Sequence, residues 1–257
     1  MKGVWGRTAA IAGILAVIAS TVTGCVTTIG GIAAASTSQD DVCYQQRLAL
    51  DESSSFVNQD IVKTAVMGAV VGAAIGALTG GAQGAIKGAV IGGLGGAAAG
   101  YWNSLQQQKV SGSALYSKMN GDMTHELEAV NKTQAAYNDL AKCRKAQETK
   151  VRGDFLSGKL NREQGNAELA KVHDLAMQDY DLASRINGKV KSRTENFSYA
   201  TQQATGKSIP KSSKATISGT PAADEAGSLQ CCSALQASNT NFEQALNNTK
   251  PGDFKPL

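Results

Sequence analysis

Nine glycines recur at every fourth position of this chain, and their spacing limits its possible folds more than any other feature. They are Gly68, Gly72, Gly76, Gly80, Gly84, Gly88, Gly92, Gly96 and Gly100, and most residues between them are Ala, Val, Ile or Leu. Each glycine costs a helix in water about 1 kcal/mol relative to alanine. In lipid, small residues at this spacing instead let two helix backbones pack closely. We therefore expect residues 64–102 to form a membrane-inserting zipper of associating helices.

A polar break from Thr79 to Gly84 divides the zipper into two halves. Each half is shorter than the roughly 20 residues that a helix needs to cross a bilayer. A four-residue repeat drifts by about 40° at each step, so the full series would leave one face of a single straight helix. This geometry favours a helical hairpin over one long helix. Tyr101 and Trp102 close the segment, and such aromatics are favoured at the membrane–water boundary.

The start of the chain predicts export. Lys2 and Arg7 precede an apolar stretch from Thr8 to Val22, which is the anatomy of a signal peptide over residues 1–24. The sequence from Val22 to Cys25 resembles the lipobox of bacterial lipoproteins, and this resemblance implies that Cys25 is acylated after cleavage. Val26, where a retention signal would have Asp, implies sorting to the outer membrane. An ordinary signal peptide with an incidental cysteine is the alternative.

The zipper resembles the glycine-zipper region of bacterial surface lipoproteins of the rickettsial 17 kDa surface antigen type. The resemblance is carried by the series Gly68–Gly100 and by the break at Thr79, Gly80 and Gly81. It implies association with the outer membrane and oligomerisation, and it supplies no catalytic residue. The alternative is a flexible Gly/Ala linker, but the polar residues typical of such linkers are nearly absent.

The rest of the chain predicts helices and linkers, and therefore an all-α fold. Residues 25–39 have the composition of a tether, and residues 40–63 contain a short helix from about Val42 to Ile61. Residues 103–204 show two amphipathic arms around a polar break at Arg152–Asn161, which predicts a long antiparallel helical hairpin. Residues 205–228 have the composition of a flexible linker. Residues 229–257 contain a last helix from about Leu229 to Asn247 and a loose tail.

Four cysteines remain besides Cys25, namely Cys43, Cys143, Cys231 and Cys232. An even number in an exported chain predicts two disulfides. Because a bond between adjacent cysteines is strained, we expect Cys231 and Cys232 to pair with Cys43 and Cys143, in an order left open. A metal site is the alternative, but the cysteines lack the paired short spacing of zinc ligands.

No catalytic, metal or cofactor site emerges from the motifs. His125 and Glu126 begin a zinc-protease pattern, but Ala129 stands where the second histidine is needed. His173 is expected on a solvated helix face. Loss of residues 1–24 lowers the formal net charge from +4 to +2, and a chain so near neutrality with scattered cations does not suggest nucleic acid as a partner.

These patterns predict a non-enzymatic outer-membrane lipoprotein, facing the periplasm or the cell surface. Its zipper would insert in membrane lipid and associate with other copies, and its helical hairpin would present a docking surface to envelope or secretion-system proteins. The alternative is a pore or secretion-channel component built from several zipper hairpins. The near absence of a polar face to line water makes that alternative the weaker one.

Overall fold

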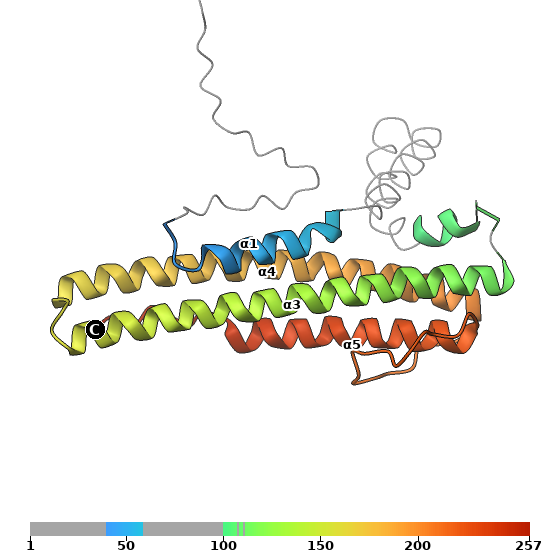
Figure 1. The fold of residues 1–257 in the computed structure, drawn as a ribbon. Helices are drawn as coiled ribbons and strands as arrows, with labels where there is room; N and C mark the ends of the chain where they lie inside the picture. Colours follow the sequence, from blue (N-terminus) through green and yellow to red (C-terminus); the bar gives the residue numbers. More distant parts are fainter. Residues whose placement is uncertain (1–39, 59–99, 107, 110) are drawn as a thin grey trace, which may run out of the picture.

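The computed structural model describes residues 40–58, 100–106, 108, 109 and 111–257, and the regular structure within these ranges is helical. The elements are α1 (Tyr44–Ser54), the 3-10 helix η1 (Ser55–Asn58), α3 (Gly112–Leu156), α4 (Arg162–Thr205) and α5 (Glu225–Thr249), and residues 100–106 form a further helical turn. The predicted all-α class is confirmed (Figure 1). The signal peptide, Cys25, the tether and the zipper glycines Gly68–Gly96 lie outside the described residues. Gly100 is described and is buried in its helical turn.

Helices α3 and α4 form the predicted antiparallel hairpin, and their closed end is referred to below as the tip. The connection is shorter than the predicted break, because α3 continues to Leu156. Gly158 adopts a φ of +75° in this turn, a conformation that favours glycine. Asn161 then caps α4 through a reciprocal capping box with Gln164. At its other end α4 stops at Gly206, whose φ is +68°.

Helix α3 runs without interruption through Asn120 and Gly121, although both residue types have a weak helix preference. Met119 and Met123 are fully buried on either side of this point, so packing outweighs the local preference. Asn120 donates a hydrogen bond to the Ala222 carbonyl at 2.5 Å and accepts one from Ser228 at 2.6 Å. A residue with a weak helix preference therefore serves to fasten α5 and its preceding loop.

Helix α5 covers one face of the hairpin along the part farther from the tip (Figure 1). It begins earlier than predicted because Asp224 caps it, accepting a hydrogen bond from the Gly227 amide at 2.8 Å. The shared core contains Met123, Val130, Tyr137 and Leu140 from α3, Leu182, Ile186 and Val190 from α4, and Leu235, Phe242 and Leu246 from α5. Between Thr249 and the tip, the tail 250–257 continues along the same face.

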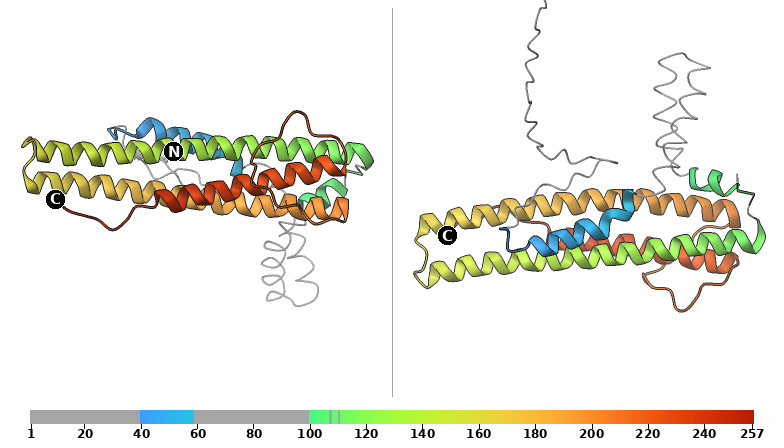
Figure 2. Two further views of the ribbon diagram at one scale, coloured as in Figure 1. Left: turned by 90° about the horizontal axis from the view of Figure 1, so that it is seen from below. Right: turned by 45° about the horizontal axis from the view of Figure 1, so that its top comes forward.

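Helix α1 lies on the other side of the hairpin, and the two views of Figure 2 show α1 and α5 separated by the plane of α3 and α4. Its packing is mostly against α3. The expected helix from Val42 to Ile61 is shorter in the structure, because α1 ends at Ser54 and η1 follows. Within the described residues, no helix combines the length and the apolar character needed to cross a bilayer.

Candidate functional site

The two described ends of the zipper segment are attached to the same place on α4. On the entering side, Phe56 of η1 is nearly buried, and the Arg193 guanidinium lies 5.4 Å from its ring centre. On the returning side, Tyr101 contacts Phe197 edge to face, with ring centres 4.9 Å apart. Arg193 and Phe197 are four residues apart, which is about one helical turn or roughly 6 Å. The described residues that precede and follow residues 59–99 are therefore attached at neighbouring points of α4.

Buried polar contacts reinforce both attachments. Arg193 forms a bidentate ion pair with Glu126: its Nε donates to Oε1 at 2.6 Å and its Nη2 donates to Oε2 at 2.5 Å. This pair connects α4 to α3 next to Phe56. The Tyr101 hydroxyl donates a hydrogen bond to Asp122 at 2.8 Å. Burial, with the nearby Asp122 carboxylate, raises the pKa of Tyr101, so the phenol stays protonated and remains a donor. These four side chains hold η1 and the helical turn at residues 100–106 in place on α3 and α4.

Tyr101 does not have the role predicted for it. The sequence suggested an aromatic pair at the membrane surface, but Tyr101 is 8% exposed and Trp102 packs partly against the bundle core. Tyr101 is buried because the Phe197 ring packs against its ring and the Asp122 carboxylate accepts a hydrogen bond from its hydroxyl. The aromatic pair therefore marks the point where the chain rejoins the bundle.

A disulfide and a buried ion network fasten α1 to the tip half of the hairpin. Cys43 is bonded to Cys143 of α3, with their Cα atoms 5.9 Å apart. Arg144 binds both oxygens of Asp41 at 2.6 Å and donates from Nε to Asp179 of α4, also at 2.6 Å. Arg47 of α1 pairs with the other oxygen of Asp179. We refer to these four charged residues and the disulfide as the α1 clamp.

Asp41 and Arg144 keep their charges although they are buried, whereas burial raises the pKa of Asp179 against the opposite effect of Arg144 and Arg47. Burial alone would raise the pKa of Asp41, but hydrogen bonds from Arg144 and the Cys43 amide outweigh it and hold that pKa below its usual value. Burial likewise opposes the charge of Arg144, yet Asp41 and Asp179 raise its pKa. Because a buried charge without its partner is costly, the clamp is stable only when all of its members are in place.

The expected disulfide pairing was wrong. The structure joins Cys43 to Cys143 and leaves Cys231 and Cys232 as buried free thiols on α5. Because α1 and α5 lie on opposite sides of the hairpin, Cys43 cannot reach α5. Burial raises the pKa of Cys231 to about 11 and also raises the pKa of Cys232, so both are protonated near neutral pH. They act as small core residues.

The tail 250–257 lies across the tip half of the hairpin, on the side away from α1. Hairpin side chains hold its backbone: Arg152 donates to the Lys255 carbonyl at 2.9 Å, Arg162 donates to the Leu257 carbonyl at 2.7 Å, and Asn166 accepts from the Leu257 amide at 2.8 Å. His173 contacts the Gly252 carbonyl at 2.9 Å and the Phe254 ring edge to face. The tail is therefore held at these points, and His173, which was predicted on a solvated face, is partly covered by it.

A steric notch receives the last residue described. A Cβ atom on Gly165 would lie 2.3 Å from Cδ1 of Leu257, so the Leu257 side chain occupies space that only glycine leaves open. The tail also shields Leu169 and Val172 of α4, which are buried although they stand apart from the main core. We call the surface beneath the tail, lined by α3 and α4, the tail groove.

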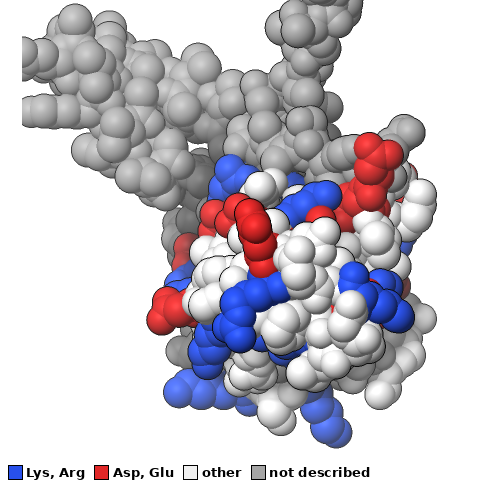
Figure 3. All heavy atoms as spheres, turned by 90° about the vertical axis from the view of Figure 1, so that its left-hand side faces the viewer, with Lys and Arg blue, Asp and Glu red and all other residues white. Residues whose placement is uncertain are grey.

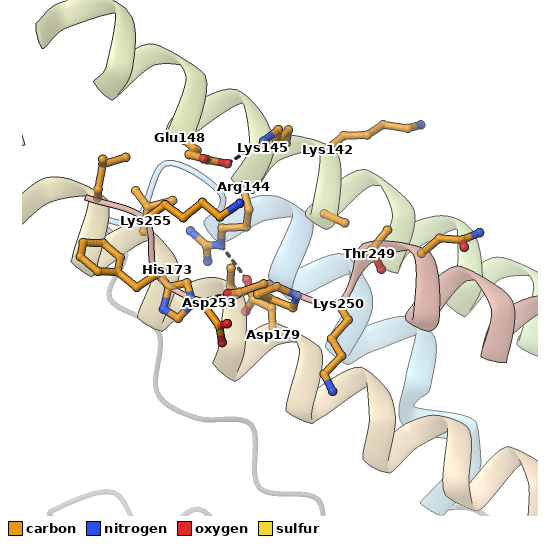
Figure 4. Close-up of a pocket in the computed structure, with 18 of the residues that line it drawn as sticks. Lys142, Arg144, Lys145, Glu148, His173, Asp179, Thr249, Lys250, Asp253 and Lys255 are labelled. Carbon is orange, nitrogen blue, oxygen red and sulfur yellow. Dashed lines mark hydrogen bonds and ion pairs between the residues drawn. The ribbon is translucent and has the colours of Figure 1, made fainter. Parts of the chain in front are cut away.

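The tail does not fill this groove. A cavity of about 670 Å³ remains between the tail and the hairpin, with Leu169, Val172 and Ala141 among its apolar lining (Figure 4). The helices contribute four cations and two carboxylates to the lining, namely Lys142, Arg144, Lys145, Arg152, Glu148 and Asp179. Arg144 and Asp179 belong to the α1 clamp as well, so the two features meet in the middle of the hairpin. The helix residues of the lining therefore carry two more cations than carboxylates, and each of these cations is paired with an acidic side chain.

Figure 3 looks onto the tip of the hairpin. Acidic side chains lie mainly in the upper and middle parts of this view, and basic side chains lie in its upper part and also along its lower part. The described residues contain no group of three or more His, Cys, Asp or Glu side chains arranged to hold a metal ion. Among its described residues, the site therefore combines a steric notch, an apolar lining and an excess of cations.

Comparison with known proteins adds one match. The family model described as a glycine zipper matches residues 65–107. The match covers the predicted zipper and associates the protein with the outer membrane. No curated protein and no solved structure matches the chain. The finer resemblance to the rickettsial surface antigen type stays a prediction.

Proposed function

We propose that this protein is a non-enzymatic outer-membrane lipoprotein. Its acylated Cys25 and its zipper would hold it at the membrane, its zippers would associate with one another, and its helical bundle would dock envelope proteins. One acyl chain binds a membrane only marginally, whereas several chains with an inserted hairpin give stable attachment. The proposal combines the zipper match with the helical bundle that the described residues form.

One observation carries the proposal, namely the attachment of both zipper ends to one turn of α4. A segment that starts beside Arg193 and ends beside Phe197 returns to its starting point. Such a path suits a hairpin that enters the membrane and comes back, and it does not suit a single span. It also supports a body held close to the membrane, because η1 and the turn at 100–106 are both fixed in the bundle core.

Crosslinking in native membranes tests the packing of the zipper. We expect Gly72→Leu to remove most crosslinked oligomers and Gly72→Ala to remove fewer, because added bulk pushes helix backbones apart. Ala74→Leu is the matched control, since about 200° of helix rotation separates it from Gly72. Equal crosslinking in all variants would contradict zipper packing.

Lipid labelling tests the anchor. Cys25→Ser should abolish incorporation of labelled acyl chains and leave precursor or soluble protein. Normal labelling of this variant would refute the lipoprotein assignment. Reconstituted full-length protein should carry no ionic current, and a reproducible conductance would favour the channel alternative instead.

A further inference from the structure

We propose that the tail groove is a binding site for an extended acidic peptide segment of a partner protein, and that the tail 250–257 occupies it as a replaceable cover. The inference rests on the proposed docking function and names the place and the chemistry of the docking. Three observations support it: how the tail is held, how poorly it fills the groove, and the charge that it brings.

The groove holds its occupant by the backbone. Arg152, Arg162 and Asn166 bond to the carbonyl of Lys255 and to the carbonyl and amide of Leu257, and these contacts depend little on the side chains of the bound segment. Extended peptides are commonly recognised in this way, with main-chain hydrogen bonds giving affinity and pockets giving specificity. The Gly165 notch is such a pocket, and it accepts an aliphatic side chain.

The fit of the tail is incomplete. The remaining cavity of about 670 Å³ is within the usual size range of ligand pockets. Phe254, the largest side chain of the tail, is 40% exposed and contacts His173 only at its edge. A segment with larger side chains would bury more of the apolar lining than the tail does.

The tail carries Lys250, Asp253 and Lys255, and Lys255 brings a positive charge to a part of the groove that already contains cations. Lys255 reaches from the tail into the cavity toward α3, where Arg144 and Lys145 lie (Figure 4). Its ammonium makes no ion pair with any described residue, since Glu148 is already paired with Lys145 and Arg152. An acidic side chain at this position would be attracted where Lys255 is repelled. A partner segment with Asp or Glu here therefore has an electrostatic advantage over the tail.

Peptide binding to purified full-length protein in detergent tests the proposal. The probe is a fluorescent peptide with the tail sequence in which Lys250 and Lys255 are replaced by Glu, and the control peptide has the native tail sequence. We expect a chain truncated after Thr249 to bind the acidic peptide at least tenfold more tightly than the full-length chain does. It should also prefer the acidic peptide to the native one by a similar factor. Equal binding of both peptides, or no effect of the truncation, would overturn the proposal.

A second variant tests the same idea without removing the tail. Lys255→Glu should strengthen docking of the tail in its own groove, measured as slower carboxypeptidase cleavage and weaker binding of the acidic peptide. Lys211→Glu, in the exposed loop before α5, makes the same charge change away from the groove and should alter neither. Unchanged or faster cleavage of Lys255→Glu would contradict the proposal. If vesicles of anionic phosphatidylglycerol displaced the acidic and the native peptide equally well, the groove would bind lipid headgroups and not an acidic peptide, which would also contradict the proposal.

These outcomes are separable from those of the zipper experiments. The truncated chain should keep its membrane association and its crosslinked oligomers. Failed peptide binding with intact anchoring would refute only the groove, whereas failed anchoring with intact peptide binding would refute only the lipoprotein assignment.

Discussion

The two faces of the hairpin near its tip are held in opposite ways. On one face α1 is fixed by a disulfide and by charged side chains buried to about 95%, including Arg47 and Asp179. On the other face the tail is held by hydrogen bonds that water can replace and by one aliphatic side chain in a notch. The first arrangement resists replacement of α1 by another segment, and the second permits replacement of the tail. Under the proposed function, the first arrangement suits the attachment of the body to a membrane segment, and the second suits a docking surface.

The disulfide should have the largest effect on stability. It closes a loop with a sequence separation of 100, and loss of such a loop constraint costs about 4 kcal/mol. We expect the double variant Cys43→Ser/Cys143→Ser to lose about this much free energy of unfolding in urea titrations. Reductant should lower the stability of the wild type but leave the double variant unchanged. Stability of the wild type that does not respond to reductant would contradict the α1 clamp.

Removing one buried charge should come next. Asp179→Asn leaves Arg47 and Arg144 without their shared carboxylate, and breaking a buried pair in this way costs about 3 kcal/mol. Asp174→Asn, an exposed position on the same helix, is the control and should change stability little. A small effect of Asp179→Asn would mean that water reaches the clamp.

The contribution of Asp41 to the pH dependence of stability has a definite sign. Because the pKa of Asp41 is held below its usual 3.8 in the folded state, its contribution is fully present above pH 3.8 and is lost as the pH falls through the lowered value. Asp41→Asn should cost about 2 kcal/mol near neutral pH, the cost of a hydrogen-bonded charge. Unfolding curves of the wild type and this variant should converge below pH 3.8. A gap of constant size down to pH 2 would show that Asp41 does not titrate as described.

The smallest effect on the bundle should come from Gly165→Ala, which changes the tail alone. Its Cβ would displace Leu257, while alanine slightly favours the helix, so global stability should shift by less than about 1 kcal/mol. The tail should nevertheless become more accessible to carboxypeptidase. Gly188→Ala on the same helix meets no atom within 4 Å and is the matched control. Equal cleavage of both variants would show that Leu257 does not use the notch.

The sequence was sufficient for the helical hairpin and insufficient for its attachments. Regular apolar spacing in α3 and α4 and the glycines near the turn predicted the hairpin, because these signals are local. The bond between Cys43 and Cys143 depends on which face α1 occupies, and four cysteines allow three pairings. Docking of the tail depends on single hydrogen bonds and on the missing side chain of Gly165. Neither feature produces a periodic pattern in the sequence from which it could be predicted. Tyr101 was misassigned because its membrane-boundary preference and its core packing favour the same residue type.

Hydrogen exchange of the full-length oxidised protein in lipid nanodiscs tests the contrast between the two faces most directly. Amides of α1 should exchange as slowly as those of the neighbouring part of α3, and reduction should speed α1 selectively. Amides of Gly252, Asp253 and Phe254 should exchange within seconds in either state, and the acidic peptide should leave those tail amides fully exposed. Slow exchange in the tail that equals that of α4, or rapid exchange in oxidised α1, would contradict a fixed face opposite a replaceable one.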